Sequence, residues 1–204
     1  MIHFNVAVEG MLDEAVVCRL LSLINAAPDN IYGKKGKGFI LKRITGYNNS
    51  AKNYPWMVLI DLDESECAPL ILKDYLPDPA PFMCLSIAVR EVESWLMADR
   101  ERIAKFLSVS QSIIPHDCDS IENPKEKLVD IARKSRRADI REDIVPRKGS
   151  GIKIGPAYTS RLVEFVLDET NGWRPESAAR SSPSLNRCIE RIVGTVNKIR
   201  TAKL

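Results

Sequence analysis

Two short and mostly apolar runs, each followed directly by an acidic residue, constrain most strongly what this chain can fold into. Residues 4–8 read FNVAV and precede Glu9, and residues 56–60 read WMVLI and precede Asp61. A short apolar run bounded by polar residues is typical of a strand buried on both faces of a parallel sheet. The sequence therefore predicts parallel strands whose carboxyl ends carry acids.

A third apolar run, residues 83–89, is followed by Glu91 and Glu93. Helical spacing of apolar residues predicts one helix after Gly10, with Asp13 as its N-cap, and another over residues 39–52. A weak strand is expected between these helices. This alternation predicts an α/β fold with a parallel sheet of about four strands flanked by helices.

Beyond Asp99 the sequence predicts helices with polar joints and no further strand. We therefore expect residues 1–115 to form the α/β core and residues 116–204 to form a helical C-terminal extension packed on it.

The composition excludes some classes of protein. Lys and Arg total 30 against 27 Asp and Glu, and this excess of +3 is too small to imply nucleic-acid binding by itself. No apolar run approaches the ~20 residues of a membrane span, so no membrane association is expected. The five cysteines are scattered singly, with no CxxC pair, which predicts reduced thiols in a cytoplasmic protein.

The acids at the strand ends predict a metal site. Ligands of such folds bind beyond the carboxyl ends of the strands. Asp61 and Asp63, two residues apart in extended chain, point to the same side. Carboxylates that share a crevice repel one another unless a cation is present, and hard oxygen ligands suit Mg²⁺ or Mn²⁺. We therefore predict Glu9, Asp61 and Asp63 as metal ligands, while solvated acids at strand ends are the alternative.

Glu91 and Glu93 are predicted as further ligands. At a strand end their side chains would share a face, whereas in a helix they would diverge by about 200°. For Glu91 an exposed acid at a helix N-terminus, stabilised by the helix dipole, is the alternative. Trp95 is expected to be a core residue rather than a substrate platform.

Five lysines are predicted to contact phosphate or nucleic acid. The loop of residues 33–38 is not a phosphate-binding P-loop, because Phe39 stands where Ser or Thr is needed. It is expected to touch phosphate without enclosing it. Two further lysines would neutralise a phosphoryl transition state. The five are Lys34, Lys35, Lys37, Lys148 and Lys153.

The basic tract of residues 133–153 alternates with Asp139, Glu142 and Asp143. This pattern favours a solvated surface of mixed charge over a nucleic-acid groove.

Residues 8–10 (VEG) together with residues 61–63 (DLD) resemble the acidic pattern of the Toprim (topoisomerase–primase) domain. Residues 91–99 (EVESWLMAD) resemble a signature of small bacterial Toprim-like proteins, which are similar to phage-defence nucleases of the overcoming-lysogenization-defect and RloB type. The resemblance implies a Toprim-like fold and metal-dependent phosphodiester chemistry with Mg²⁺ or Mn²⁺. It implies catalytic roles for Glu9, Asp61, Asp63 and Glu93, and it favours Glu93 over Glu91.

These features lead to one expected function and its alternatives. The first is a divalent-metal-dependent nuclease acting on DNA or RNA, as an effector in anti-phage defence with an ATPase partner encoded nearby. The second is a non-catalytic Toprim-like module that binds a partner protein or nucleic acid. A phosphatase is a third, since the same metal chemistry serves monoesters.

Overall fold

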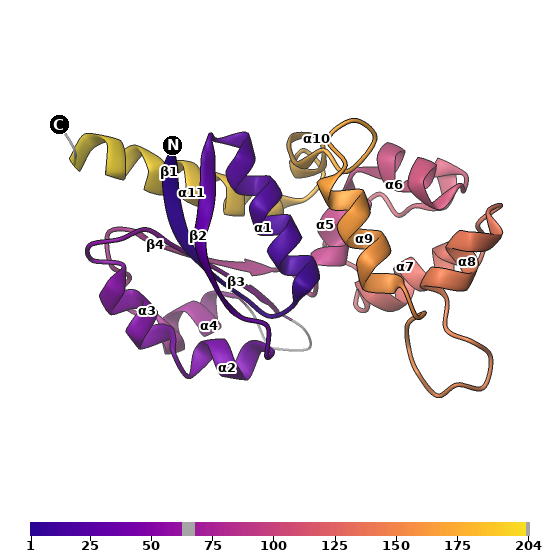
Figure 1. The fold of residues 1–204 in the computed structure, drawn as a ribbon, viewed down its shortest axis with the longest axis horizontal. Helices are drawn as coiled ribbons and strands as arrows, with labels where there is room; N and C mark the ends of the chain where they lie inside the picture. The colour runs from indigo at the N-terminus through magenta and orange to yellow at the C-terminus, as the bar shows by residue number, and fades with distance from the viewer. Residues whose placement is uncertain (63–67, 203–204) are drawn as a thin grey trace. The chain divides into compact units, whose positions relative to one another are not determined.

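The structure, a computed structural model, describes residues 1–62 and 68–202 of the chain. The chain divides into two compact units (Figure 1). The sheet unit comprises Met1–Val89 and Asn186–Leu204, and the helical unit comprises Arg90–Leu185. Residues 90–115, which the sequence analysis grouped with the sheet, thus belong to the helical unit.

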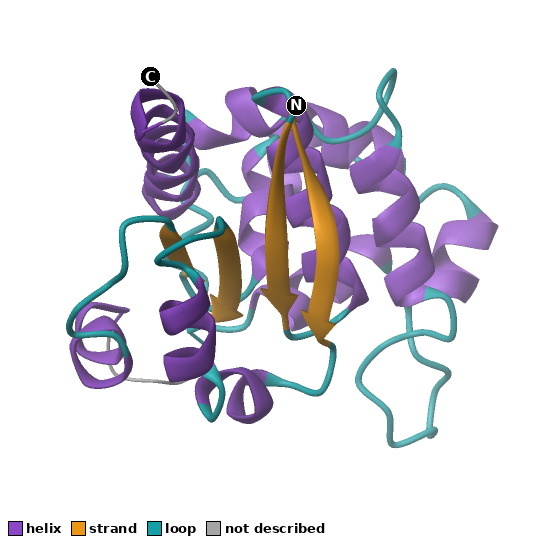
Figure 2. Ribbon diagram, turned by 60° about the vertical axis from the view of Figure 1, so that its left-hand side comes forward, coloured by secondary structure: helices purple, strands orange, loops and turns teal. Residues whose placement is uncertain are grey.

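The sheet unit is built on four strands that all run parallel. They are β1 (Ile2–Val8), β2 (Ala26–Gly33), β3 (Trp56–Asp61) and β4 (Met83–Ala88), in the order β2-β1-β3-β4. Figure 2 shows the strands running in one direction, so that their carboxyl ends share one edge. The predicted α/β fold with a parallel sheet of about four strands is confirmed. The weak strand is β2, an edge strand, where Pro28 is tolerated although it cannot donate to the ladder.

Helices cover both faces of this sheet, as the buried strands require. Figure 1 shows α2 (Lys37–Leu41), α3 (Ile44–Ser50) and α4 (Ala68–Tyr75) on one face, and α1 (Met11–Leu23) and α11 (Pro183–Ala202) on the other. On the first face, Ile40 and Ile44 belong to one buried cluster with Val58 of β3. On the second face, Arg191 of α11 donates from Nη1 to the carbonyl oxygen of Leu85 at 3.0 Å.

Two local predictions are wrong. Instead of one helix over residues 39–52, the chain forms α2 and α3, because the backbone turns at Lys42 and Arg43. There the N–H of Arg43 bonds to the carbonyl of Ile40 at 2.9 Å, a tight i→i−3 turn. Asp13 is not an N-cap either. The N-cap of helix α1 is Gly10, three residues earlier, and Asp13 Oδ2 accepts the N–H of Gly10 at 2.8 Å from inside the first turn.

The helical unit confirms the predicted helical character of the C-terminal part. Its α-helices are α5 (Val92–Ala98), α6 (Arg100–Leu107), α7 (Pro124–Ala132), α8 (Ala138–Ile144), α9 (Tyr158–Leu167) and α10 (Pro175–Ala179). Its core holds Trp95 and Trp173, both fully buried. The Nε1 of Trp95 donates to Ser184 Oγ at 2.7 Å, and that of Trp173 to the carbonyl of Trp95 at 3.1 Å. Trp95 is therefore a core residue, as predicted.

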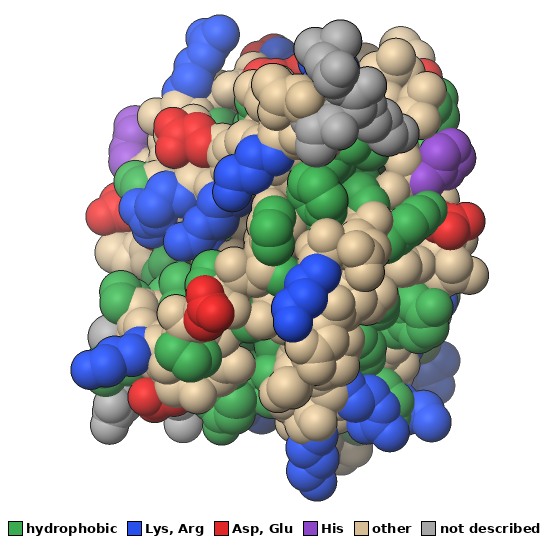
Figure 3. Space-filling view, turned by 90° about the vertical axis from the view of Figure 1, so that its left-hand side faces the viewer, with side chains coloured by type: hydrophobic (Ala, Val, Ile, Leu, Met, Phe, Trp, Pro, Cys, Tyr) green, Lys and Arg blue, Asp and Glu red, His purple; other side chains and the backbone are tan. Residues whose placement is uncertain are grey.

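The surface carries mixed charge. Figure 3 shows one face of the molecule, on which Lys and Arg side chains lie among apolar side chains and Asp and Glu groups. None of the helices in the described part of the chain combines a membrane-spanning length with sufficient apolar character.

Gly33 ends β2 so close to β1 that a side chain does not fit. Its φ is +96°, and a Cβ there would lie 2.2 Å from the carbonyl oxygen of Val8. We expect Gly33→Ala to lower the free energy of unfolding by more than about 2 kcal/mol, because the left-handed backbone alone costs ~1–2 kcal/mol and the clash adds to it. Chemical denaturation measures the loss. Gly36→Ala is the control, since Gly36 has φ +77° but nothing within 4 Å. Equal losses in both variants would contradict the close approach.

Candidate functional site

Glu9 and Asp61 meet at the carboxyl edge of the sheet. Glu9 follows the last residue of β1, and Asp61 is the last residue of the neighbouring β3. The backbone N–H of Asp61 donates to Glu9 Oε1 at 2.9 Å. Both residues are half-buried. The structure thus brings together two of the predicted ligands and holds the carboxylate of Glu9 in place.

Lys37 reaches the same edge from the start of α2. Its Nζ donates to the carbonyl oxygen of Asp61 at 2.8 Å and to that of Leu62 at 3.1 Å. The N–H of Gly36 bonds to the carbonyl of Glu9 at 3.3 Å, so the loop before α2 is tied to the same place. The ammonium of Lys37, predicted to contact phosphate, therefore also holds the chain where it leaves β3.

The two other lysines of this loop have different surroundings. Lys34 forms an ion pair with Glu14 at 2.6 Å, and its N–H bonds to the carbonyl of Val8 at 2.8 Å. Lys35 places its Nζ 5.3 Å from the centre of the Phe39 ring. The charge of Lys35 is therefore more available to an anionic ligand than that of Lys34, because no carboxylate among the described residues pairs with Lys35.

The acids at this edge carry hard oxygen donors, the type that a divalent cation such as Mg²⁺ prefers. The backbone of Asp61 contacts the carboxylate of Glu9, while Asp63, the third predicted ligand, lies outside the described residues. Among the described residues no group of three His, Cys, Asp or Glu side chains is close enough to hold a metal ion. Mg²⁺ commonly keeps several waters and binds through one or two carboxylates, so the two described acids suit it.

Glu91 and Glu93 lie in the helical unit and share a cation, Lys125. Glu91 is the N-cap residue of α5 in extended conformation, and Glu93 lies in the first turn. Lys125 Nζ is 2.8 Å from Glu91 Oε1 and 3.7 Å from Glu93 Oε1. The N–H of Lys125 also donates to Glu91 Oε2 at 2.8 Å. The two carboxylates therefore do not diverge as they would inside a helix.

Glu93 is the more unusual of this pair because its side chain is only 2% exposed. Tyr158 donates its hydroxyl to Glu93 Oε1 at 2.9 Å, and Glu93 Oε2 has no hydrogen-bond partner among the described residues. Burial raises the pKa of Glu93 to about 7; Lys125 opposes this rise and Glu91 adds to it. A carboxyl group with such a pKa can exchange a proton near neutral pH.

Lys125 and Tyr158 were not predicted from the sequence. They lie 34 and 65 residues from their glutamate partners and come from α7 and α9. No spacing rule links residues so far apart, and a lone Lys or Tyr at a helix start carries no signal of its own. Only the fold brings them together.

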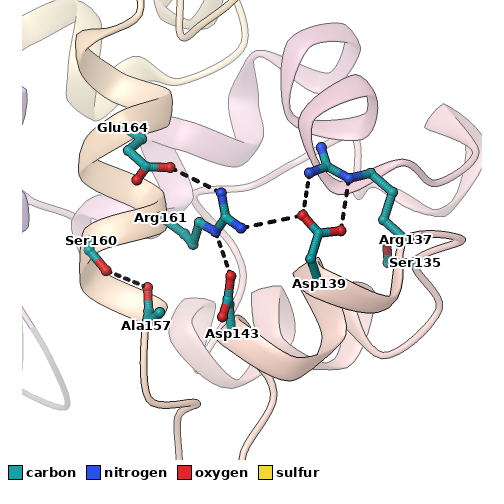
Figure 4. A network of polar contacts seen from close by, with 8 residues as sticks. All are labelled: Ser135, Arg137, Asp139, Asp143, Ala157, Ser160, Arg161 and Glu164. Atoms are coloured by element: carbon teal, nitrogen blue, oxygen red, sulfur yellow. Dashed lines mark hydrogen bonds and ion pairs between the residues drawn. The ribbon is translucent and has the colours of Figure 1, made fainter.

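Three cations of the basic tract of residues 133–153 form ion pairs with described carboxylates of the helical unit, and they are Arg133, Arg137 and Lys153. Figure 4 shows Arg137 paired with Asp139, and Arg161 paired with Asp139, Asp143 and Glu164. Lys153 pairs with the exposed Glu126 at 3.0 Å. Lys148 is exposed in the loop that precedes α9. Contacts of Lys148 and Lys153 with phosphate stay predictions.

Removal of the Lys37 ammonium should weaken the edge. We expect Lys37→Met to lower the free energy of unfolding by about 1–3 kcal/mol, because two carbonyl oxygens lose a charged donor. Chemical denaturation measures this loss. Lys42→Met is the matched control, since Lys42 is exposed in the same segment and its removal should stay within about 0.5 kcal/mol. A loss of the same size in both variants would contradict the role of Lys37.

Glu93 should make stability fall as pH rises. Its pKa is 4.5 in the unfolded chain and about 7 in the folded protein, so the folded state holds the proton more tightly between these values. We expect the free energy of unfolding to fall between about pH 4.5 and pH 7, by at most about 3 kcal/mol from this group. Glu93→Gln should flatten that fall, whereas the exposed Glu122→Gln should not. Denaturation at several pH values measures it, and an unchanged profile in Glu93→Gln would contradict the shift.

A scan against protein-family models, a search of curated proteins and a search of solved structures each return no match to this chain. The resemblance to Toprim proteins therefore stays a prediction from the quoted residues.

Proposed function

We propose that this protein is a divalent-metal-dependent nuclease whose reacting centre lies at the carboxyl edge of the sheet unit. The observation that carries the proposal is the hydrogen bond from the Asp61 N–H to Glu9 Oε1 at 2.9 Å. This bond holds Glu9, one predicted metal ligand, against β3, the strand that ends with Asp61, another predicted ligand. Carboxylates at the carboxyl ends of adjacent parallel strands lie where ligands of such folds bind.

The residues at this edge would bind the cation and hold the end of β3. Glu9 and Asp61 hold the cation, together with Asp63, which is assigned from the sequence alone. When bound, Mg²⁺ or Mn²⁺ polarises a phosphate oxygen and lowers the pKa of a bound water. Lys37 keeps the end of β3 in place through the carbonyls of Asp61 and Leu62, so the carboxylates need little rearrangement before they act.

Within the helical unit, Glu93 is proposed as a group that exchanges a proton rather than as a metal ligand. A metal ligand must be deprotonated, whereas burial keeps Glu93 protonated up to near neutral pH. Tyr158 and Lys125 hold its carboxyl group through the hydroxyl at 2.9 Å and the ammonium at 3.7 Å. Glu91, paired closely with Lys125, stays a predicted ligand.

The cellular setting is proposed from the sequence. The resemblance to phage-defence nucleases suggests an effector in anti-phage defence that works with an ATPase. The scattered cysteines suggest the cytoplasm as its compartment.

Substitution of the edge carboxylates tests the function. Purified protein with Mn²⁺ should cleave at least one of three substrates: supercoiled DNA, single-stranded DNA or a structured RNA. We expect Glu9→Gln and Asp61→Asn to lower the rate at least about 100-fold, because each removes a charged ligand worth several kcal/mol to the reaction. Isothermal calorimetry should show weaker Mn²⁺ binding in the same variants. Asp74→Asn is the control, since Asp74 is an exposed acid of the same unit on α4.

Loss of cleavage in Asp74→Asn to the same extent, or full activity in Glu9→Gln, would sink the nuclease proposal. A folded wild-type protein that neither binds Mn²⁺ nor cleaves any of the three substrates would favour the binding module instead.

One observation favours that second candidate. An open hollow of about 790 Å³ lies in the sheet unit, lined by Asn48, Lys52, Tyr75, Asp78 and their neighbours. These residues precede β3 and β4 in the chain, so the hollow adjoins the amino ends of those strands and not the edge that bears Glu9 and Asp61. Tyr75 is 46% exposed there, as an anchor for a partner would be.

A further inference from the structure

We propose that the nucleic acid that reaches the carboxyl edge is single-stranded, and that residues 32–43 bind it by base stacking and by charge. The proposal rests on the proposed function, because it names the substrate class of the same site. We call residues 32–43 the basic-aromatic segment.

The charge of this part of the chain is strongly one-sided. Residues 30–60 contain no Asp or Glu, although the whole chain is nearly balanced at 30 basic against 27 acidic residues. The same stretch contains six basic residues, and five of them lie in the basic-aromatic segment. Binding of a phosphate backbone depends on such a local excess of basic residues rather than on net charge, although Lys34 is paired with Glu14 from outside the stretch. The six are Lys34, Lys35, Lys37, Lys42, Arg43 and Lys52.

Phe39 is flanked by two of these cations. The guanidinium carbon of Arg43 lies 3.6 Å from the centre of the Phe39 ring, and Lys35 Nζ lies 5.3 Å from it. Arg43 and Lys35 are both exposed, and neither forms an ion pair with a described carboxylate. Ile40 directly follows Phe39, and Ile44 directly follows Arg43. Both isoleucines are buried, so Phe39 and Arg43 lie next to the side of the chain that faces the core. A ring stacked with a planar guanidinium offers a flat, cationic contact surface.

Tyr32 offers a second ring at the start of the segment. It is 42% exposed, and it stacks on Trp56 with ring centres 5.2 Å apart. Trp56 in turn stacks on Tyr47 at 4.4 Å, and both of these are buried. The exposed ring is therefore held from beneath by two others. A held, exposed aromatic ring is what proteins use to stack an unpaired base.

The segment is tied directly to the proposed reacting centre. The N–H of Lys34 bonds to the carbonyl of Val8, and that of Gly36 to the carbonyl of Glu9. Lys37 Nζ bonds to the carbonyl of Asp61. A strand lying on the basic-aromatic segment would thus lead its backbone to the edge where the carboxylates lie.

Ring faces distinguish single strands from duplexes. In a duplex the bases stack on one another and present only their edges, so a ring face finds no partner. A protein that recognises duplex DNA would also need an element that enters a groove. Helix α2 has only five residues, which is short for that role. The exposed Tyr32 ring, the half-buried Phe39 ring and the exposed cations of Lys35 and Arg43 therefore fit an unpaired strand of DNA or RNA.

Oligonucleotide binding tests the proposal without cleavage. Fluorescence anisotropy with labelled single-stranded DNA, single-stranded RNA and duplex DNA is measured in EDTA, so that no metal-dependent reaction occurs. We expect Phe39→Leu to weaken single-strand binding by about tenfold, because it keeps apolar volume and removes the ring. Phe39→Tyr keeps a ring and should bind like the wild type. Lys35→Ala should reduce the slope of log affinity against log salt by about 0.7, the value for one phosphate contact in a single strand.

Phe106→Leu is the matched control, because Phe106 is a half-buried ring stacked on Phe165 in the helical unit. It should leave binding unchanged. The thermal unfolding midpoint of Phe39→Leu, compared with that of Phe39→Tyr, separates lost binding from lost folding.

Tighter binding to duplex than to single strands, or equal affinity in Phe39→Leu and the wild type, would overturn the single-strand proposal and leave the nuclease proposal standing. If single-strand binding depends on Phe39 but the protein cleaves no substrate, the single-strand proposal is supported and the nuclease proposal is contradicted. Tighter binding to the DNA probe or to the RNA probe shows which of the two nucleic acids the protein prefers.

Discussion

Burial of β3 and β4 on both faces is the constraint on which the rest of the sheet unit depends. Residues 56–60 and every residue of β4 are buried. Helices must therefore cover both faces, and parallel strands require crossover connections that return the chain to the same end of the sheet. Each strand then finishes at one edge. Glu9 and Asp61 meet there because of this topology, since 52 residues separate them in the chain.

The elements with their own hydrophobic signal were predictable from the sequence, and the breaks between them were not. The apolar runs marked β1, β3 and β4, and with them the positions of the edge acids. The division between α2 and α3 could not be predicted from the sequence, because Ile40, Ile44 and Tyr47 keep helical spacing across it. The start of α1 was misplaced because Asp13 can cap a helix from outside or from its first turn, and residue type does not distinguish the two.

The polar partners of the candidate residues were even harder to predict. Glu9 is held by a backbone N–H and Lys37 by two carbonyls, and backbone groups have no identity in a sequence. The partners of Glu93 come from two distant helices. An acid can thus be recognised from its context, while its counter-ion depends on tertiary packing. The same holds for Arg161, whose three carboxylate partners include two from the preceding helix, α8.

The sheet unit is encoded in two separate stretches, and this has a consequence for synthesis. Residues 186–202 of α11 complete the unit that residues 1–89 begin, and Arg191 reaches back to Leu85 across 106 positions. At about 5–20 residues per second, translation of the intervening helical unit takes on the order of 5–20 s. During that time the sheet face that α11 covers stays open on the nascent chain. Any activity of the carboxyl edge that needs the finished sheet would therefore arise only after α11 has left the ribosome.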